Sequence, residues 1–205
     1  MDFKYFYSFG SKLLSSTFQA GAEGLINRDD SFGSDRLLMG NFTNIKFPVI
    51  FRQTFGKKLC DILDTGDVSL FLISDKMLNI LKENNFSGWK TYPIRLYDRK
   101  NNEIYGYNGF SVIGKCEATT KYKRDSLFEK RLVPNGPLST YYKGLYIDFT
   151  KWDGSDFFIP KGSLRIVITQ NVRDIILKNK LTNINIRNIK DIEVSDFKMQ
   201  EEDLI

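Results

Sequence analysis

The chain has 205 residues, of which 41% are hydrophobic, 27% charged and 14% aromatic, and its formal net charge is +5. A compact chain of this length buries about 70% of the surface that its unfolded form exposes, and such apolar and aromatic content excludes a disordered chain. Histidine is absent, which removes the commonest general base and zinc ligand, although Lys, Asp or Glu can still perform acid–base chemistry. The two cysteines, Cys60 and Cys116, form no CxxC motif and indicate no disulfide scaffold.

The N-terminal region gives weak signals. Glycines interrupt every periodic run over residues 1–45, so we expect one short strand near Phe3–Tyr7 and loop or short helix after it. The N-terminus has no cationic segment followed by an apolar one, as a secretory signal would. No stretch approaches the roughly 20 apolar residues of a membrane-spanning helix. We therefore expect a cytoplasmic protein with no membrane partner.

A strand–helix pattern follows. Pro48–Phe51 predicts a short strand, and the apolar run Val68–Ile73 predicts a buried one. Ser74 or Asp75 then caps a short helix with one apolar face.

A long hairpin is predicted next. Trp89–Tyr97 has the pattern of a strand, in which Pro93 indicates an edge or a bulge. A polar turn follows, and Glu103–Lys115 returns as a long strand. We interpret Trp89 and Trp152 as mainly structural residues, although an exposed Trp can also anchor a partner.

The second half of the chain repeats part of this pattern. We expect an excursion loop over residues 117–143 and a strand at Gly144–Phe149. Arg165–Ile168 then predicts a strand, followed by a capped helix and a strand at Thr182–Ile186.

The two strand–helix–strand units resemble each other at an offset of about 95 residues. Ser74 corresponds to Thr169 at the cap, and Asn84 to Asn179 at the end of the helix. An internal duplication explains this likeness, and so does the general need of such units for these residue types. We predict an α+β fold with a mixed or antiparallel sheet, a few short helices and two related strand–helix–strand units. Residues 1–205 are expected to form a single domain.

A group of carboxylates follows the predicted strand at Gly144–Phe149. Asp148, Asp153 and Asp156 lie within nine positions, a spacing that a paired-carboxylate hydrolase or a Ca²⁺ loop could use. No Glu closes an EF-hand loop, and Asp-Gly is typical of a turn in which Asp side chains bond nearby backbone amides. We favour the turn and expect no metal.

The densest positive charge lies at Lys115–Arg131, where six basic residues alternate with three acidic ones. A solvated loop, an acidic partner or nucleic acid can each account for it. The acidic tail Glu201–Asp203 is expected to be frayed.

Several motifs in combination resemble predicted immunity proteins of bacterial polymorphic toxin systems. They are Ser74–Lys76 before a helix, Gly88–Pro93, Gly106–Tyr107, Trp152–Phe158, and Ile168–Thr169 opening a second helix. The resemblance covers residues 68–190, the immunity-like core, and residues 1–60 add nothing to it. It implies an α+β cytoplasmic protein that binds and neutralises a cognate toxin domain. It implies no chemistry of its own, no cofactor and no catalytic residues.

The predicted function is therefore toxin neutralisation by binding, without enzymatic activity. The alternatives are a hydrolase using Asp148, Asp153 and Asp156, or a nucleic-acid-binding protein using Lys115–Arg131. Because a rigid scaffold presents its binding residues on loops, we predict that the partner meets Lys123, Arg124, Asp153 and Asp156. Their opposite charges would steer the partner. The basic net charge argues against a nuclease toxin, because antidotes to nucleases are often acidic.

Overall fold

The computed structural model of the chain describes residues 5–12, 14–23, 33–67 and 69–205. The strands of the first 106 residues are β1 (Phe6–Ser11), β2 (Gln19–Ala22), β3 (Val49–Phe55), β4 (Ile62–Asp64), β5 (Phe71–Ser74), β6 (Trp89–Tyr92), β7 (Ile94–Tyr97) and β8 (Glu103–Ile104). Those that follow are β9 (Tyr107–Val112), β10 (Gly114–Thr119), β11 (Lys121–Tyr122), β12 (Leu127–Arg131), β13 (Leu138–Lys143), β14 (Leu145–Tyr146), β15 (Phe157–Lys161), β16 (Ile166–Thr169), β17 (Ile184–Asn188) and β18 (Glu193–Ser195). The α-helices are α1 (Gly33–Leu38), α2 (Asp75–Glu83) and α3 (Gln170–Lys178), with short 3-10 helices that include η2 (Arg124–Ser126), η3 (Phe149–Lys151) and η6 (Glu201–Asp203).

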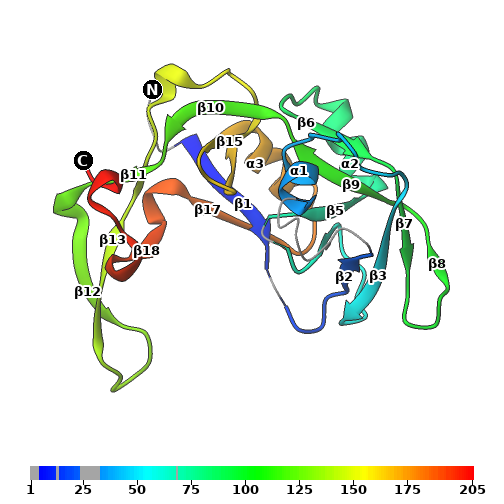
Figure 1. The fold of residues 1–205 in the computed structure, drawn as a ribbon, viewed down its shortest axis with the longest axis horizontal. Coiled ribbons are helices and arrows are strands. Elements are labelled where there is room, and N and C mark those ends of the chain that lie inside the picture. The colour runs from blue at the N-terminus through cyan, green and yellow to red at the C-terminus, as the bar shows by residue number, and fades with distance from the viewer. Residues whose placement is uncertain (1–4, 13, 24–32, 68) are drawn as a thin grey trace.

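Two large mixed sheets organise the molecule. An eight-stranded sheet, in the order β6-β9-β5-β4-β2-β3-β7-β8, curls into a half-barrel. Beside it lies a five-stranded sheet in the order β10-β15-β16-β1-β17. A three-stranded sheet, β12-β13-β18, stands apart at the end of the molecule that holds the C-terminus (Figure 1). The predicted α+β class is thus confirmed.

Pro93 explains the curl of the eight-stranded sheet. Proline lacks the N–H that a continuing ladder needs, and the predicted strand divides there into β6 and β7. β6 pairs with β9, with Trp89 opposite Val112, whereas β7 pairs with β3, with Ile94 opposite Val49. Consecutive strands therefore lie near opposite edges of one sheet, which must bend to bring those edges together.

The two predicted strand–helix–strand units are present with matching boundaries. β5 and α2 begin at residues 71 and 75, and β16 and α3 begin at residues 166 and 170, an offset of 95. The amide groups of Asn84 and Asn179 donate to the carbonyls of Ile80 and Ile175, at 2.8 and 2.9 Å. Each Asn thus closes its helix in the same way.

The two halves of the chain, residues 5–106 and 107–205, exchange one strand each. β1 of the first half lies between β16 and β17, and β9 of the second half lies between β5 and β6. The registers match, because Phe9 lies opposite Ile166 and Phe110 lies opposite Phe71. β9 then continues through β10 into the five-stranded sheet, as the long green path in Figure 1 shows. Neither half completes its sheet alone.

The main core is built from both halves. The rings of Phe9, Phe71, Phe110 and Phe157 meet at its centre with centroids 5.5–6.4 Å apart. A smaller cluster lies on the other face of the five-stranded sheet and includes Phe6, Phe158 and Val167. The N-terminal region, which gave little signal in the sequence, therefore supplies a central strand of the fold.

Three expectations are corrected. The loop expected over residues 117–143 contains β11, β12 and β13. β12 and β13 form a hairpin that packs little in the core, so charged residues replace the apolar alternation that marks a buried strand. The tail is docked rather than frayed, because Ile205 donates to the carbonyl of Tyr122 at 2.9 Å. Finally, Gly106 separates β8 from β9 within the expected long strand Glu103–Lys115.

Two of the predicted strands begin at residues that the structure does not describe. Phe3 and Val68 belong to predicted strands and lie outside the described residues. None of the helices in the described part of the chain is long and apolar enough to cross a membrane.

Candidate functional site

The first two carboxylates of the predicted cluster accept hydrogen bonds from backbone N–H groups. Asp148 caps η3 by accepting from the N–H and hydroxyl of Thr150, at 3.1 and 2.6 Å, and these bonds lower its pKa. Asp153 accepts from the N–H of Lys115 at 2.7 Å and from the N–H of Ser155 at 3.0 Å. Burial raises the pKa of Asp153, but the bonds from Ser155 and Lys115 outweigh it and hold that pKa below its ordinary value. The predicted turn is therefore present.

The third carboxylate joins the two halves of the molecule. Asp156 accepts from the N–H and hydroxyl of Ser87 and from the hydroxyl of Thr169, each at 3.0 Å. Thr169 precedes α3 of its own half, whereas Ser87 follows α2 of the other half. The Asp156 carboxylate thus contacts residues of both halves of the chain.

Asp61, 95 positions earlier, makes the reciprocal connection. It accepts from the hydroxyl of Ser74 at 2.9 Å and from the N–H and hydroxyl of Thr182, each at 2.7 Å. The two Asp side chains therefore form a symmetric brace across the halves. Asp148, Asp153 and Asp156 share no hydrogen-bond partner, and no group of three or more Cys, Asp or Glu in the described ranges could hold a metal ion.

The basic stretch Lys115–Arg131 does not form one free patch. Arg124 pairs with Glu201 of the docked tail, and Lys130 pairs with Glu193 of β18. Lys123 is exposed before η2. Within the described residues, no hydrogen bond or ion pair joins Lys123 or Arg124 to Asp153 or Asp156, and their part in partner binding stays a prediction.

A different surface emerges when the two halves are compared. In the first half, α1 covers one face of the sheet, where the hydroxyl of Ser111 donates to the carbonyl of Leu37. The ring of Tyr92 lies over Gly109 so closely that a Cβ there would be 2.1 Å from it. Leu37, Leu70 and Tyr92 are buried, so this face is closed.

Part of the same face in the second half, beside the smaller cluster that includes Phe6 and Val167, is open and polar. The matching strand positions hold Ser8, Gly10, Arg165, Asn185 and Arg187 in place of Gly109, Ser111, Leu70, Lys90 and Tyr92. Arg165, Asn185 and Arg187 are exposed, and a Cβ on Gly10 would meet only Phe71, at 3.8 Å. We call these five residues, Ser8, Gly10, Arg165, Asn185 and Arg187, the open face.

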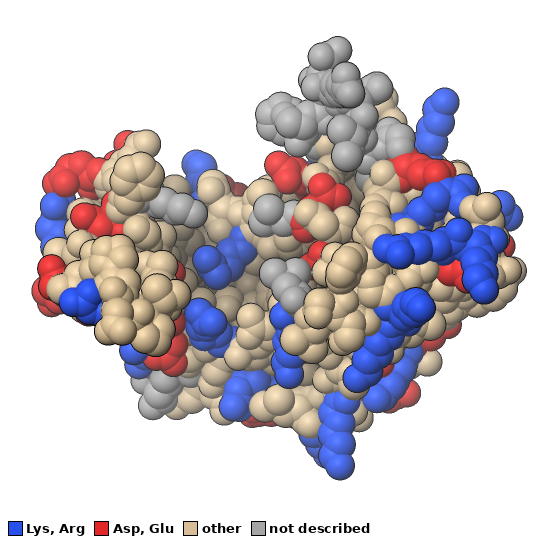
Figure 2. Space-filling view, turned by 90° about the horizontal axis from the view of Figure 1, so that it is seen from below, with Lys and Arg blue, Asp and Glu red and all other residues tan. Residues whose placement is uncertain are grey.

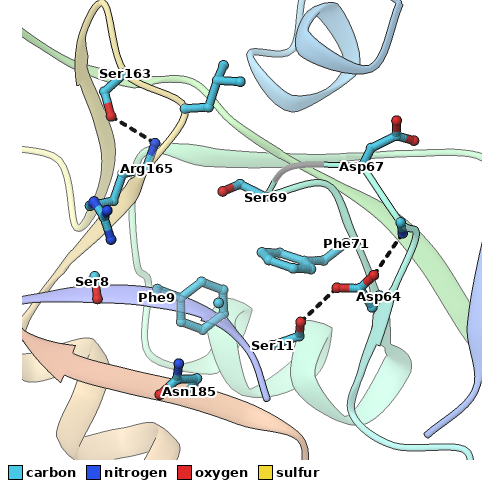
Figure 3. A pocket seen from close by; sticks show the side chains of 13 residues that line it. Ser8, Phe9, Ser11, Asp64, Asp67, Ser69, Phe71, Ser163, Arg165 and Asn185 are labelled. Carbon is cyan, nitrogen blue, oxygen red and sulfur yellow. Dashed lines mark hydrogen bonds between the residues drawn. The ribbon is translucent and has the colours of Figure 1, made fainter. Parts of the chain in front are cut away.

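A pocket of about 580 Å³ lies at one end of the open face. Arg165 lies on one side of it and Asp64 and Asp67 on the opposite side, with the rings of Phe9 and Phe71 between them (Figure 3). Asp64 accepts from the hydroxyl of Ser11 at 2.8 Å and from a backbone N–H at 2.7 Å, which fixes its carboxylate. This volume is within the range of small-molecule sites.

The charged side chains that the structure describes on the two sides of the pocket form no ion pair with each other. Within the described residues, no carboxylate lies at ion-pair distance from Arg165 or Arg187. Burial is the main cause that raises the pKa of Asp67, and Asp35 and Asp64 raise it further against a hydrogen bond from Ser34. Asp64 itself is only 7% exposed. The pocket thus has a basic side and an acidic side.

A hollow lies beside the lobe formed by the three-stranded sheet (Figure 2). Seen from below, the lobe at the left, which holds β12, β13 and β18, stands away from the rest of the molecule, and Lys and Arg side chains line the space between them (Figure 2). At the tip of the β12–β13 hairpin, Leu132, Val133 and Leu138 are 70%, 59% and 54% exposed.

The sequence had not identified the open face. The sequence feature that could have indicated this face is Arg165. It is a charged residue beside an apolar strand, and it takes the position that Leu70 has in the other unit. No protein-family model matches the chain, and no match is found among curated proteins. The resemblance to immunity proteins therefore stays a prediction from motifs.

Proposed function

We propose that this protein binds a partner protein in the hollow and neutralises it, as an immunity protein does for a cognate toxin domain. The observation that carries the proposal is the open face. Its counterpart in the first half is filled by α1, whereas here exposed Arg165, Asn185 and Arg187 replace buried or packed residues. Charged side chains that form no ion pair within the described structure are suited to an external partner.

The β12–β13 hairpin supports a protein partner over a small metabolite. Its exposed Leu132, Val133 and Leu138 would give such a partner an apolar contact beside a charged one. Interfaces combine these two elements, an apolar centre and a polar rim.

The two alternatives are less well supported. The hydrolase hypothesis requires two of the carboxylates Asp148, Asp153 and Asp156 in one pocket, and each binds a different partner. Nucleic acid would find basic residues in the hollow (Figure 2) and at Arg165 (Figure 3), but Asp64 and Asp67 on the other side of the pocket would repel a phosphate backbone.

Co-expression tests the proposal. If a neighbouring gene encodes a toxin domain, that domain should arrest growth alone, and the protein should restore growth and form a stable complex with it on gel filtration. Arg165→Gln combined with Arg187→Gln should weaken both effects, whereas Lys100→Gln, in the exposed turn after β7, should not. Absence of both rescue and complex with the unaltered protein would refute the proposal.

A further inference from the structure

The open face and the pocket together favour one kind of ligand. Arg165 precedes β16 and Arg187 lies on β17, with β1 between the two strands. Neighbouring strands are about 4.8 Å apart, so the two backbones lie roughly 10 Å apart across β1. Both side chains can therefore reach a common group above Ser8 and Gly10. Guanidinium groups bind carboxylates and phosphates with paired hydrogen bonds.

The opposite wall favours a positive group. Asp64 is held by Ser11, and Asp67 lies near Asp35 and Asp64 with no basic partner among the described residues. Close carboxylates in a partly buried site repel each other when both are ionised, and a cation bound between them relieves this repulsion. A ligand that bears only negative charge would satisfy Arg165 and be repelled here.

We propose that the pocket binds an extended peptide segment of the partner that carries an acidic and a basic side chain on the same edge. The acidic side chain binds Arg165 and Arg187, and the basic one binds Asp64 and Asp67. In an extended chain, residues i and i+2 point to the same side about 7 Å apart, so a motif of the form Glu-x-Lys presents both charges to one surface. This inference rests on the proposed function only in taking the segment to be part of a partner protein.

The first test is a titration of the isotopically labelled protein, followed by NMR. The probes are the blocked tripeptides acetyl-Glu-Ala-Lys-amide, acetyl-Lys-Ala-Glu-amide, acetyl-Glu-Ala-Glu-amide and acetyl-Lys-Ala-Lys-amide, with inorganic phosphate and a single-stranded DNA oligonucleotide as competing chemistries. At least one mixed-charge peptide should shift the amides of Ser8–Ser11 and Asp64–Phe71. It should bind on the order of tenfold more tightly than the same-charge peptides, since one charged hydrogen bond contributes about that factor.

Variants make the test specific. Arg165→Gln and Asp67→Asn should each weaken binding of the mixed-charge peptide about tenfold, and Lys100→Gln should leave it unchanged. Gly10→Val keeps every charge but fills the pocket, where a Cβ meets only Phe71 at 3.8 Å, and should abolish binding without unfolding the protein.

Three results would overturn the inference. They are equal binding of same-charge peptides, tighter binding of phosphate or the oligonucleotide, and shifts confined to other residues. No toxin domain takes part in the titration. A failed titration beside a stable toxin complex would refute the peptide ligand alone, and the converse result would refute the toxin partner alone.

Discussion

The two halves of this molecule use one scaffold in two ways. Each has a strand, a helix and a returning strand at matching positions, with a strand from the other half inserted between them. In the first half, Leu70 and Tyr92 point to the face that α1 covers, and both are buried. In the second half, Arg165 and Arg187 take those positions and remain exposed. A repeated scaffold can thus close one copy for stability and leave the other open for binding.

The halves also depend on each other. Asp61 and Asp156 each bind the residue before the helix of their own half and the residue after the helix of the other. Together with the exchanged strands β1 and β9, this brace joins the two units. The strands of the open face are thus held by contacts from both halves of the chain.

The largest expected effect comes from breaking the brace. Asp61 is 8% exposed and accepts three hydrogen bonds, so Asp61→Ala leaves buried donors unpaired. We expect a loss of about 3–4 kcal/mol in the free energy of unfolding. Asp156 is half-buried, so Asp156→Ala should cost about 2 kcal/mol. Urea denaturation measures both, with Asp125→Ala, an exposed substitution, as the control. If both variants matched the control, the brace would not stabilise the fold.

The sequence predicted well those strands and helices of the two units that depend on short-range signals. Caps and apolar faces are short-range signals, so β5, α2, β16 and α3 were anticipated close to their observed bounds. The structural interpretation of the two Trp residues agrees with their contacts. Trp89 donates to the carbonyl of Phe86 at 2.8 Å, and Trp152 donates to that of Ser155 at 3.1 Å.

Contacts between segments that are distant in the sequence could not be predicted from local patterns. No local pattern states that β1 pairs with β16 and β17 more than 150 residues later, since register between distant strands is set by the whole core. Asp156 looked like a surface turn residue because its partner Ser87 is distant in sequence. The open face was not predicted from the sequence. Whether a surface stays uncovered depends on which distant segments pack on it, and a local sequence pattern does not show this.

The second prediction exchanges equivalent residues between the halves. Gly109 and Ser8 occupy matching positions, but a Cβ at Gly109 would overlap the ring of Tyr92 at 2.1 Å. We expect Gly109→Ser to reduce the free energy of unfolding by about 3 kcal/mol through overpacking. Ser8→Gly, on the open face, should cost only about 0.5–1 kcal/mol through backbone entropy. Thermal and urea unfolding of the two variants compare them directly. Equal losses would mean that the two faces are equally packed.

The smallest expected effect on stability concerns Asp67, on the acidic side of the pocket. Here the substitution should stabilise the protein, whereas those above destabilise it. Burial raises the pKa of Asp67 above its ordinary value, so folding favours the protonated carboxyl. The stability that this group contributes is complete below its unfolded pKa and is lost as pH rises through its folded pKa. Asp67→Asn removes the ionisation while keeping an oxygen that can accept from Ser34. The variant should therefore be more stable than the parent at neutral pH, and the difference should vanish in acid.

Asp98 provides the matched control for this prediction. Hydrogen bonds from Asn102 lower its pKa, so Asp98→Asn should lose stability at neutral pH and recover parity in acid. Urea midpoints measured from acid to neutral pH would reveal the opposite slopes of the two variants. A parallel response would mean that the Asp67 carboxylate is as well accommodated as that of Asp98. Opposite slopes would mean that ionised Asp67 weakens the free protein, and a bound cationic side chain would then relieve that cost.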